Sequence, residues 1–403
     1  MQLDSTDAAA NPSDYALGQG SNCVWAGEQD RPLATGTQVT VERSVAFGYR
    51  DLDQWLDVAQ GRAPGYIYSR NTNPTVSALE AKVAALEGAA DSTAFASGMA
   101  AISNTLLALL SPGDRVVSTN DTYGGTSKIF LEVLPHFGID VVLCDTADHE
   151  AIEREIALGC RLVYLESPTN PTLKVLDLAR LARAAHHVGA LVVVDNTFAT
   201  PINQNPLRLG ADLVIHSATK FLGGHADALG GVLCGSRELV RTVFHHREIT
   251  GAALDPSAAY LLLRGMKTLH LRVARQNASA MAIARWLETH AAIASVFYPG
   301  LESNAGHEIA RSQMRGFGGV LSFELAAGSE AISLFLPKLR LAHLAANLGA
   351  VETIAGPPAT TSHVECSADE RAALGIPEGL IRYSVGIEEP EDLIADLARA
   401  LSA

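Results

Sequence analysis

Apolar runs of strand length alternate with amphipathic stretches through the middle of the chain, from about residue 69 to residue 255. Apolar runs of about four to eight residues are typical of buried strands, whereas apolar residues spaced three and four apart are typical of helices. This alternation predicts an α/β domain with a large, mainly parallel sheet. The predicted strands cover residues 115–118, 141–144, 162–166, 191–195, 213–216 and 231–234.

Two amphipathic helices are predicted near the start of this domain. The first follows Asn73, has apolar residues spaced three and four apart between Val76 and Leu86, and has Pro74 in its first turn, where proline is tolerated. The second follows Ser97, a residue type that caps helices. Both helices should pack their apolar faces on the sheet.

The order of the elements changes after Pro256. A long helical stretch over residues 257–290 is followed by strands over 320–325 and 380–385 and by a closing helix after Pro390. This order predicts a smaller C-terminal α+β domain.

The pattern therefore divides the chain into three parts. We expect an N-terminal arm over residues 1–65, the large α/β domain over residues 66–255 and the C-terminal domain over residues 256–403. The arm has no clear period, and its residues 36–49 fit either a strand or an extended segment. Contact with a neighbouring subunit is one use of such an arm.

Composition narrows the classes of function. Of the 403 residues, 48% are hydrophobic, which suffices for a large core and excludes disorder as the main state. The 30 basic and 44 acidic residues give a net charge of −14, so neither nucleic acid nor an anionic membrane is an expected partner. No apolar run approaches the roughly 20 residues that span a bilayer, and no secretory signal is recognisable, so a cytoplasmic location is expected.

Cysteines and histidines indicate neither a disulfide framework nor a metal site. The five cysteines include no C-x-x-C pair, and the thirteen histidines include no H-E-x-x-H pattern. We therefore expect reduced thiols and no metal.

Lys220 is the most informative of the six lysines. It follows a predicted strand and precedes a glycine-rich segment, at a strand end of the kind where open α/β sheets bind ligands. The lysines predicted on solvated surfaces are Lys82, Lys174, Lys267 and Lys338.

Asp195 ends another predicted strand, where its carboxylate would face the same cleft. By itself it is equally typical of a helix cap and of a metal ligand. A lysine that forms an imine and a carboxylate that pairs with a pyridinium nitrogen are, however, the two requirements of pyridoxal phosphate chemistry. Lys220 and Asp195 together predict pyridoxal 5'-phosphate as the cofactor.

A phosphate site and a stacking ring complete this prediction. Gly98 and Met99 open a helix whose first N–H groups would stabilise an anion, or which is simply an ordinary capped helix. Ser217 and Thr219 offer hydroxyl donors from the other side. The ring of Tyr123 either stacks on a flat cofactor or belongs to the core.

From about Ala46 to the C-terminus the chain resembles the cystathionine γ-synthase, cystathionine γ-lyase and methionine γ-lyase family. The motifs include YSRNTNPT, ASGMAAI, DTYGGT, ESPTNP, VVDNTFATP and IHSATKFLGGH, in that order. The resemblance implies a fold type I pyridoxal phosphate enzyme that assembles as a homotetramer of dimers with shared active sites.

The resemblance also implies roles for particular residues. Lys220 would bind the cofactor covalently, Asp195 would pair with its pyridine nitrogen and Tyr123 would stack on its ring. The residues expected at the phosphate are Gly98, Met99, Ser217 and Thr219, with Tyr68 and Arg70 from the neighbouring subunit. The residues expected at the amino-acid substrate are Arg382, which would clamp the α-carboxylate, and Asn170 beside it.

Departures from the family pattern bear on the reaction. Many members have Glu-Ser-Leu-Gly where this chain has Ala346-Asn347-Leu348-Gly349, so Asn347 becomes the candidate substrate contact and an acidic contact to a distal ammonium is lost. Thr361 and Ser362 replace a common Met-Thr pair, and Lys128 replaces an arginine. Glu248 fits either a site residue or a solvated helix face.

These departures favour γ-elimination from a methionine-like, O-substituted homoserine or canavanine-like substrate. The alternatives are γ-replacement, as in a cystathionine γ-synthase or an acylhomoserine sulfhydrylase, and β-elimination of cystathionine. Outside enzymology, a cofactor-binding scaffold without turnover is the alternative, because a fold does not specify a function.

Overall fold

The computed structural model describes residues 17–28, 36–364 and 366–402. Its larger sheet has seven strands in the order β1-β7-β6-β5-β4-β2-β3. Strands β2 to β6 are parallel, whereas β7 runs antiparallel to both of its neighbours. The bounds are β1 Asp91–Phe95, β2 Arg115–Thr119, β3 Asp140–Cys144, β4 Leu162–Glu166, β5 Leu191–Asp195, β6 Leu213–Ser217 and β7 Gly231–Gly235.

All six strands predicted for this sheet are present, but the pattern missed β1. Ser92 and Thr93 make β1 too polar to be recognised as a buried strand, although both side chains are buried. The Ser92 hydroxyl donates to the Glu80 carbonyl at 2.6 Å, and the Glu80 carboxyl accepts from the Ala94 N–H at 2.8 Å. Such bonds make the burial of a polar strand tolerable.

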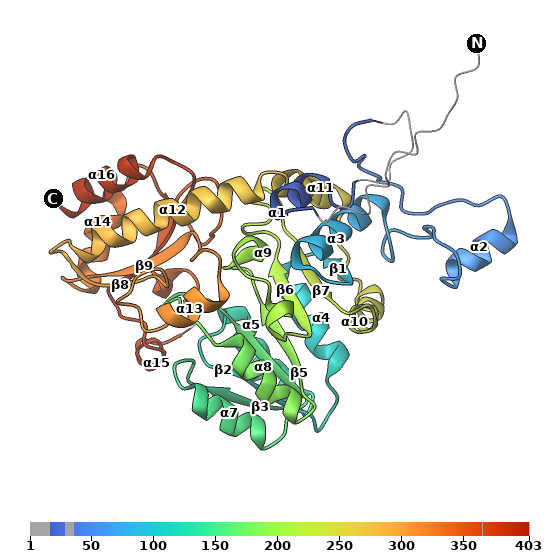
Figure 1. Cartoon of the computed structure of the whole chain (residues 1–403), viewed down its shortest axis with the longest axis horizontal. Coiled ribbons are helices and arrows are strands. Elements are labelled where there is room, and N and C mark those ends of the chain that lie inside the picture. Colours follow the sequence, from blue (N-terminus) through green and yellow to red (C-terminus); the bar gives the residue numbers. More distant parts are fainter. Residues whose placement is uncertain (1–16, 29–35, 365, 403) are drawn as a thin grey trace, which may run out of the picture.

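Helices cover both faces of this sheet, as in other α/β domains (Figure 1). Neighbouring residues of β5 face opposite layers: Val193 packs in the cluster that contains α4, and Val192 packs in the cluster that contains α7 and α8. The bounds are α3 Pro74–Glu87, α4 Gly98–Leu109, α5 Gly124–Lys128, η2 Ile129–Val133, α6 Leu134–His136, α7 His149–Ala157, α8 Leu178–His187, α9 Thr200–Asn203, η3 Pro206–Leu209 and α10 Arg237–Thr250.

A second sheet has five strands in the order β10-β11-β12-β9-β8. The two strands and the closing helix predicted in this part are confirmed as β9, β12 and α16. The bounds are β8 Ile293–Phe297, β9 Val320–Leu325, β10 His343–Leu344, β11 Ile354–Gly356, β12 Leu380–Ser384, α13 His307–Gln313, α14 Ser329–Phe335, η4 Leu336–Lys338, η5 Pro358–Thr360, α15 Ala368–Ala373 and α16 Pro390–Leu401.

The helical stretch predicted over residues 257–290 is divided into α11 Pro256–Met266 and α12 Leu269–Glu288. The first turns of α12 pack in the core of the large sheet through Leu269 and Val273, whereas Ile283 and Leu287 pack in the core of the second sheet. α12 therefore links the two sheets (Figure 1). The domain division at residue 256 stays a prediction.

The N-terminal part combines a packed helix with an extension. α1 (Gln19–Trp25) lies against the body, because the buried Lys82 ammonium donates to the carbonyls of Cys23 and Val24. Thr40 and Glu42 still bond to Thr75 at the start of α3, and the residues from 44 to 68 reach away from the body and include α2 (Leu52–Ala59) (Figure 1). Residues 36–49 are extended, and within the described chain they form a single backbone bridge, from Ala46 to Tyr68.

The predicted solvation is wrong for Lys82, whereas Lys174 and Lys267 are partly exposed, with side chains 27% and 26% accessible. The Lys82 side chain is fully buried and pairs with Glu28 at 3.0 Å. The Lys174 ammonium pairs with the buried carboxyl of Asp121 at 3.1 Å. No helix in the described ranges combines the length and the apolar character needed to cross a bilayer.

Candidate active site

A cavity of about 250 Å³ opens at the carboxyl ends of β4, β5 and β6. This is the edge at which open α/β sheets generally bind ligands. Its far wall comes from the segments that surround the second sheet, including β12. The polar residues that line it are Ser97, Tyr123, Glu166, Asn170, Asp195, Thr197, Ser217, Thr219, Lys220, Thr361, Ser362 and Arg382.

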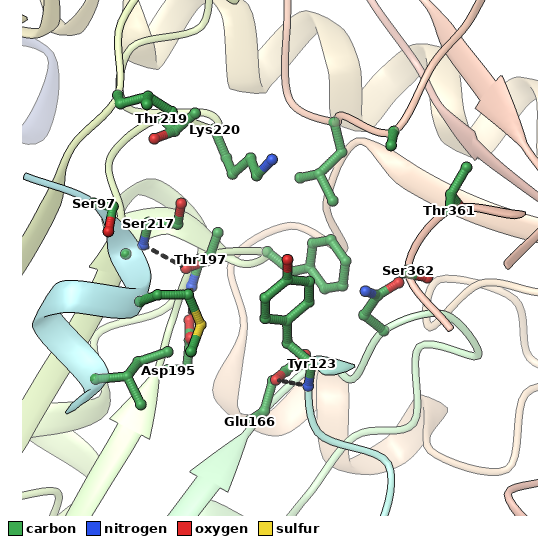
Figure 2. Close-up of a pocket in the computed structure, with 18 of the residues that line it drawn as sticks. Ser97, Tyr123, Glu166, Asp195, Thr197, Ser217, Thr219, Lys220, Thr361 and Ser362 are labelled. Atoms are coloured by element: carbon green, nitrogen blue, oxygen red, sulfur yellow. Dashed lines mark hydrogen bonds between the residues drawn. The ribbon is translucent and has the colours of Figure 1, made fainter. Parts of the chain in front are cut away.

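Lys220 lies in the turn that follows β6, and its side chain extends into the cavity (Figure 2). Its Nζ donates to Oδ1 of Asn347 at 2.7 Å. Burial and, to a smaller extent, the positive charge of Arg382 lower the pKa of the Lys220 amine from 10.5 to about 8. A larger fraction of this amine is therefore neutral, and nucleophilic, near neutral pH than of an ordinary lysine.

Asp195 is the last residue of β5, and its side chain is 8% exposed. The carboxyl group accepts from the Thr197 N–H at 3.0 Å and from the Tyr164 hydroxyl at 3.4 Å. Burial raises its pKa, since a desolvated carboxylate is costly without a compensating charge. A protonated ring nitrogen would supply that charge.

A candidate anion-binding site lies where the start of α4 meets the end of β6. The Ser97 side chain caps α4 by accepting from the Ala100 N–H at 3.1 Å, which leaves the first N–H groups of the helix at the cavity. A Cβ atom on Gly98 would lie 2.8 Å from Cβ of Ser217, so only glycine lets the helix start so close to the end of β6. With the hydroxyls of Ser217 and Thr219, these N–H groups fit a phosphate.

Tyr123 directly precedes the short helix α5, and its ring stands between the walls of the cavity (Figure 2). Its side chain is 43% exposed, which leaves a ring face available to a flat ligand. The prediction that this residue lies at the site, rather than in the core, is therefore supported by its position.

Arg382 on β12 is buried at the second-sheet side of the cavity. Its guanidinium donates to Oδ1 of Asn170 at 3.0 Å and to the backbone carbonyl of Asn347 at 3.1 Å. Burial lowers its pKa to about 10, so the group is still cationic at neutral pH. Arg382, Asn170, Asn347 and Lys220 thus form one connected set of contacts, suited to an amino acid with a free carboxylate.

Four residues named from the sequence lie outside this cavity. Tyr68 and Arg70 are exposed at the base of the extension, with the Arg70 guanidinium 5.5 Å from the centre of the Tyr68 ring. Lys128 pairs with Glu132 at 2.7 Å. Glu248 accepts from Asn71 and from Nδ1 of His245. Within one described chain, none of them reaches the cavity that contains Lys220.

The sequence interpretation also missed residues that line the cavity. Glu166 ends β4 as Asp195 ends β5, and the two residues are aligned in register. The signal that identified Asp195, a carboxylate after a buried apolar strand, was therefore present for Glu166 as well. Thr197 was missed too, and its hydroxyl accepts from the Ser217 N–H at 2.8 Å.

The residues at this site fit pyridoxal phosphate. An amine with a lowered pKa, a buried carboxyl group, a ring face and a candidate anion-binding site surround a single cavity. No cluster of three or more potential metal ligands occurs in the described part of the chain.

Comparison with known proteins supports this chemistry. The family model described as "Cys/Met metabolism PLP-dependent enzyme" matches residues 20–402. A cystathionine γ-lyase of Bacillus subtilis is 46% identical, over 85% of this chain and 90% of that protein. The chloroplastic cystathionine γ-synthase 1 of Arabidopsis thaliana is 41% identical, over 100% of this chain and 72% of that protein.

The fold is also that of a solved relative. A crystal structure of cystathionine γ-synthase from Xanthomonas oryzae pv. oryzae, in complex with aminoacrylate and cysteine, superposes with a TM-score of 0.91. It is 37% identical, and the match covers 96% of this chain and 98% of that one. The similar proteins thus include both a lyase and synthases.

Proposed function

The chain belongs to the Cys/Met metabolism family of pyridoxal phosphate-dependent enzymes, and we propose that it eliminates the γ-substituent of a homoserine-derived amino acid. The observation that supports this proposal best is the meeting of Lys220, Asp195 and Arg382 in one cavity whose far wall includes Ala346. The first three residues provide for chemistry on an α-amino acid. Ala346 provides no charge for the distal ammonium of cystathionine.

We propose that the family cofactor lies with its phosphate at the N-terminus of α4 and its ring nitrogen toward Asp195. Gly98, Met99, Ser217 and Thr219 would hold the phosphate, and Tyr123 would stack on the ring. When bound, the cofactor supplies an electron sink for carbanion chemistry. The chain's own residues then bind the substrate and move its protons.

Arg382 would bind the substrate α-carboxylate through its planar fork, which matches a carboxylate in two parallel hydrogen bonds. Asn170 holds one side of the guanidinium in place, and the Asn347 carbonyl holds another. A fixed carboxylate orients the amino group and the Cα–H bond toward the Lys220 side of the cavity. Holding two reacting groups in a fixed orientation can supply a large part of an enzyme's rate acceleration.

Lys220 would act first as a nucleophile and then as a general base. When free, its Nζ would accept the proton from Cα, and loss of a proton from Cβ would let the γ-substituent depart with the bonding electrons. The two protons would be returned, one to the leaving group and one to Cγ. Hydrolysis would then release a 2-oxo acid and ammonia.

The site is proposed to be completed by a second subunit. Tyr68 and Arg70 lie outside the cavity of their own chain, on an extension whose helix α2 exposes the apolar side chains of Leu52, Trp55 and Leu56. We propose that they reach the phosphate of a neighbouring subunit within a homotetramer. The unpaired thiols of buried cysteines such as Cys234 favour the cytoplasm as its location.

γ-Replacement is the second candidate, because a synthase is similar over the whole length of the chain. In that reaction a thiol such as cysteine, rather than water, completes the turnover. Both candidates use the same cofactor and the same first steps. They differ at the wall that contains Ala346, Thr361 and Ser362.

The test is a panel of amino acids assayed for 2-oxo acid. The panel compares, at equal concentration, O-acetylhomoserine, O-succinylhomoserine, methionine, canavanine and cystathionine. We expect each of the first four substrates to yield more 2-oxo acid than cystathionine does. Ala346→Glu is the matched variant and should raise turnover of cystathionine by about tenfold, through a charged contact to its distal ammonium. Preference of the native chain for cystathionine, or no product from any substrate, would contradict the proposal.

A further inference from the structure

Glu166 is a buried carboxyl group in the cavity to which the proposed function assigns no role. It is the last residue of β4, and its side chain is only 6% exposed. In the parallel pairing of β4 and β5 it is aligned with Asp195. Figure 2 shows it directly beneath Tyr123.

One backbone N–H group binds this carboxyl group: the N–H of Tyr123 donates to Oε2 at 2.9 Å. The backbone N–H of Asn170 also acts on the carboxyl group, since it lowers the pKa of Glu166. The two N–H groups lie in different loops, one after β2 and one after β4. A carboxyl group suits this position, because both of its oxygens can accept hydrogen bonds.

The two loops have different tasks in the proposed site. The first positions the ring of Tyr123, and the second positions Asn170, whose side-chain oxygen accepts from Arg382 at 3.0 Å. One carboxyl group therefore joins the ring-stacking residue to the group that orients the carboxylate clamp. The alignment with Asp195 fixes this junction relative to the residue proposed at the ring nitrogen.

Burial of a carboxyl group at this position costs folding free energy. Burial raises the pKa of Glu166, the neighbouring charge of Asp195 raises it further, and the N–H of Tyr123 opposes both effects. A buried polar group without partners would destabilise the fold, so the hydrogen bond from the Tyr123 N–H is what makes this residue tolerable.

We propose that Glu166 is a positioning residue that sets Tyr123 and the Asn170–Arg382 pair at a fixed spacing across the cavity. This inference rests on the roles proposed above for Tyr123 and Arg382. Glu166 acts through other residues and exchanges no proton with the substrate.

The test compares Glu166→Ala and Glu166→Gln with Glu153→Gln as the matched control. Glu153 is a half-exposed carboxylate that pairs with Arg180 at 2.6 Å, outside the cavity. Three quantities are measured: amide hydrogen exchange of residues 121–125 and 168–172 in the cofactor-free protein, the Kd for pyridoxal phosphate, and the KM and kcat for the best substrate of the panel.

For Glu166→Ala we expect exchange at residues 121–125 to rise about tenfold or more, because the Tyr123 amide loses its acceptor. Exchange at residues 168–172 should rise by a smaller factor, because the Asn170 amide loses the carboxyl group that it acts on. The Kd and KM should rise by similar factors, with a smaller change in kcat. For Glu166→Gln, which retains one acceptor oxygen, one segment should stay protected while the other exchanges faster. Glu153→Gln should leave all of these values unchanged.

The inference is overturned if both segments exchange at the native rate in folded Glu166 variants, or if the Kd and KM rise without any local change in exchange. If Glu166→Ala does not fold, the Glu166→Gln variant tests the proposal, since glutamine preserves the side-chain volume. The exchange experiment needs no cofactor. If the native protein binds no pyridoxal phosphate, the proposed function is refuted. The exchange data would still decide whether Glu166 holds the two loops.

Discussion

The two ends of the cavity are built differently. The cofactor end, formed by residues 97–99, Asp195 and residues 217–220, lies on strand ends and a helix start. The distal end, formed by Ala346, Thr361 and Ser362, lies on connecting segments around the second sheet, and Ala346 is exposed. Regular elements hold functional groups more rigidly than loops do, whereas loops tolerate more variation.

The two ends also differ in how tightly the backbone is packed. Gly98 has no room for a methyl group beside Ser217, and Gly231 has none beside the Ser97 carbonyl, which would lie 2.1 Å from a Cβ atom. At the distal end, three substitutions, Ala346, Thr361 and Ser362, distinguish this chain from the family pattern without disturbing the fold. The chemistry of the cofactor is therefore expected to be robust, and the choice of substrate to depend on a few side chains.

The largest expected effect is at the cofactor end. Lys220→Ala should lower kcat/KM by about a thousandfold or more, because it removes both the nucleophile and the base. Purified native protein should be yellow, and borohydride should trap the cofactor on the peptide that contains Lys220. Recovery of the reduced cofactor on a different lysine would overturn the assignment.

The second prediction asks whether the cofactor end is complete in one chain. Arg70→Ala and Lys220→Ala should each be nearly inactive alone. After co-refolding, random pairing should restore about one quarter of native activity, because about half of the dimers are mixed and each has one intact site of two. Absence of recovery, with mixed dimers demonstrated by mass, would place Arg70 at the site of its own subunit.

The third prediction concerns Arg382, which lies between the cofactor end and the distal end of the cavity. Arg382→Lys keeps the positive charge but loses the planar fork, so KM should rise about ten- to a hundredfold while the cofactor spectrum stays native. Steady-state kinetics and the absorption spectrum measure the two effects. A change in the spectrum with an unchanged KM would assign Arg382 to the cofactor instead.

A smaller effect follows from the pKa of Lys220, which burial lowers to about 8. The rate of covalent attachment of pyridoxal phosphate to cofactor-free protein should rise about tenfold per pH unit below pH 8 and level off above it, because only the neutral amine attacks. Stopped-flow absorbance measures this profile. A midpoint near the ordinary lysine value of 10.5 would show that the amine is solvated, against the geometry.

Sequence reasoning worked best where the hydrophobic pattern and the chemistry coincide. β5 and β6 are apolar runs that end in Asp195 and Ser217, so both strands and both site residues were predictable together. β1 was not predictable, because its Ser92 hydroxyl and its Ala94 N–H are bonded by Glu80 on α3, contacts that only the folded chain creates.

Side chains defined by tertiary contacts were also missed. Lys82 resembles any lysine on a helix face, yet it caps the end of α1 from 59 positions away. Glu166 occupies the same kind of strand end as Asp195, but its hydrogen-bond partner is a backbone N–H of the loop after β2, which has no sequence signature. The family resemblance supplied Arg382 and Asn170, which spacing alone would not have paired across 212 positions.

The most direct test of the central claim is the fate of O-succinylhomoserine in the presence of saturating cysteine. The proposed site binds the amino acid through Arg382 and Lys220 but has no acidic group at Ala346 to hold the ammonium of a second amino acid. We predict that 2-oxobutanoate stays the main product, with cystathionine a minor one, when both are measured in the same reaction. If cysteine diverts most of the flux into cystathionine, the chain is a γ-synthase and the proposed preference for elimination is wrong.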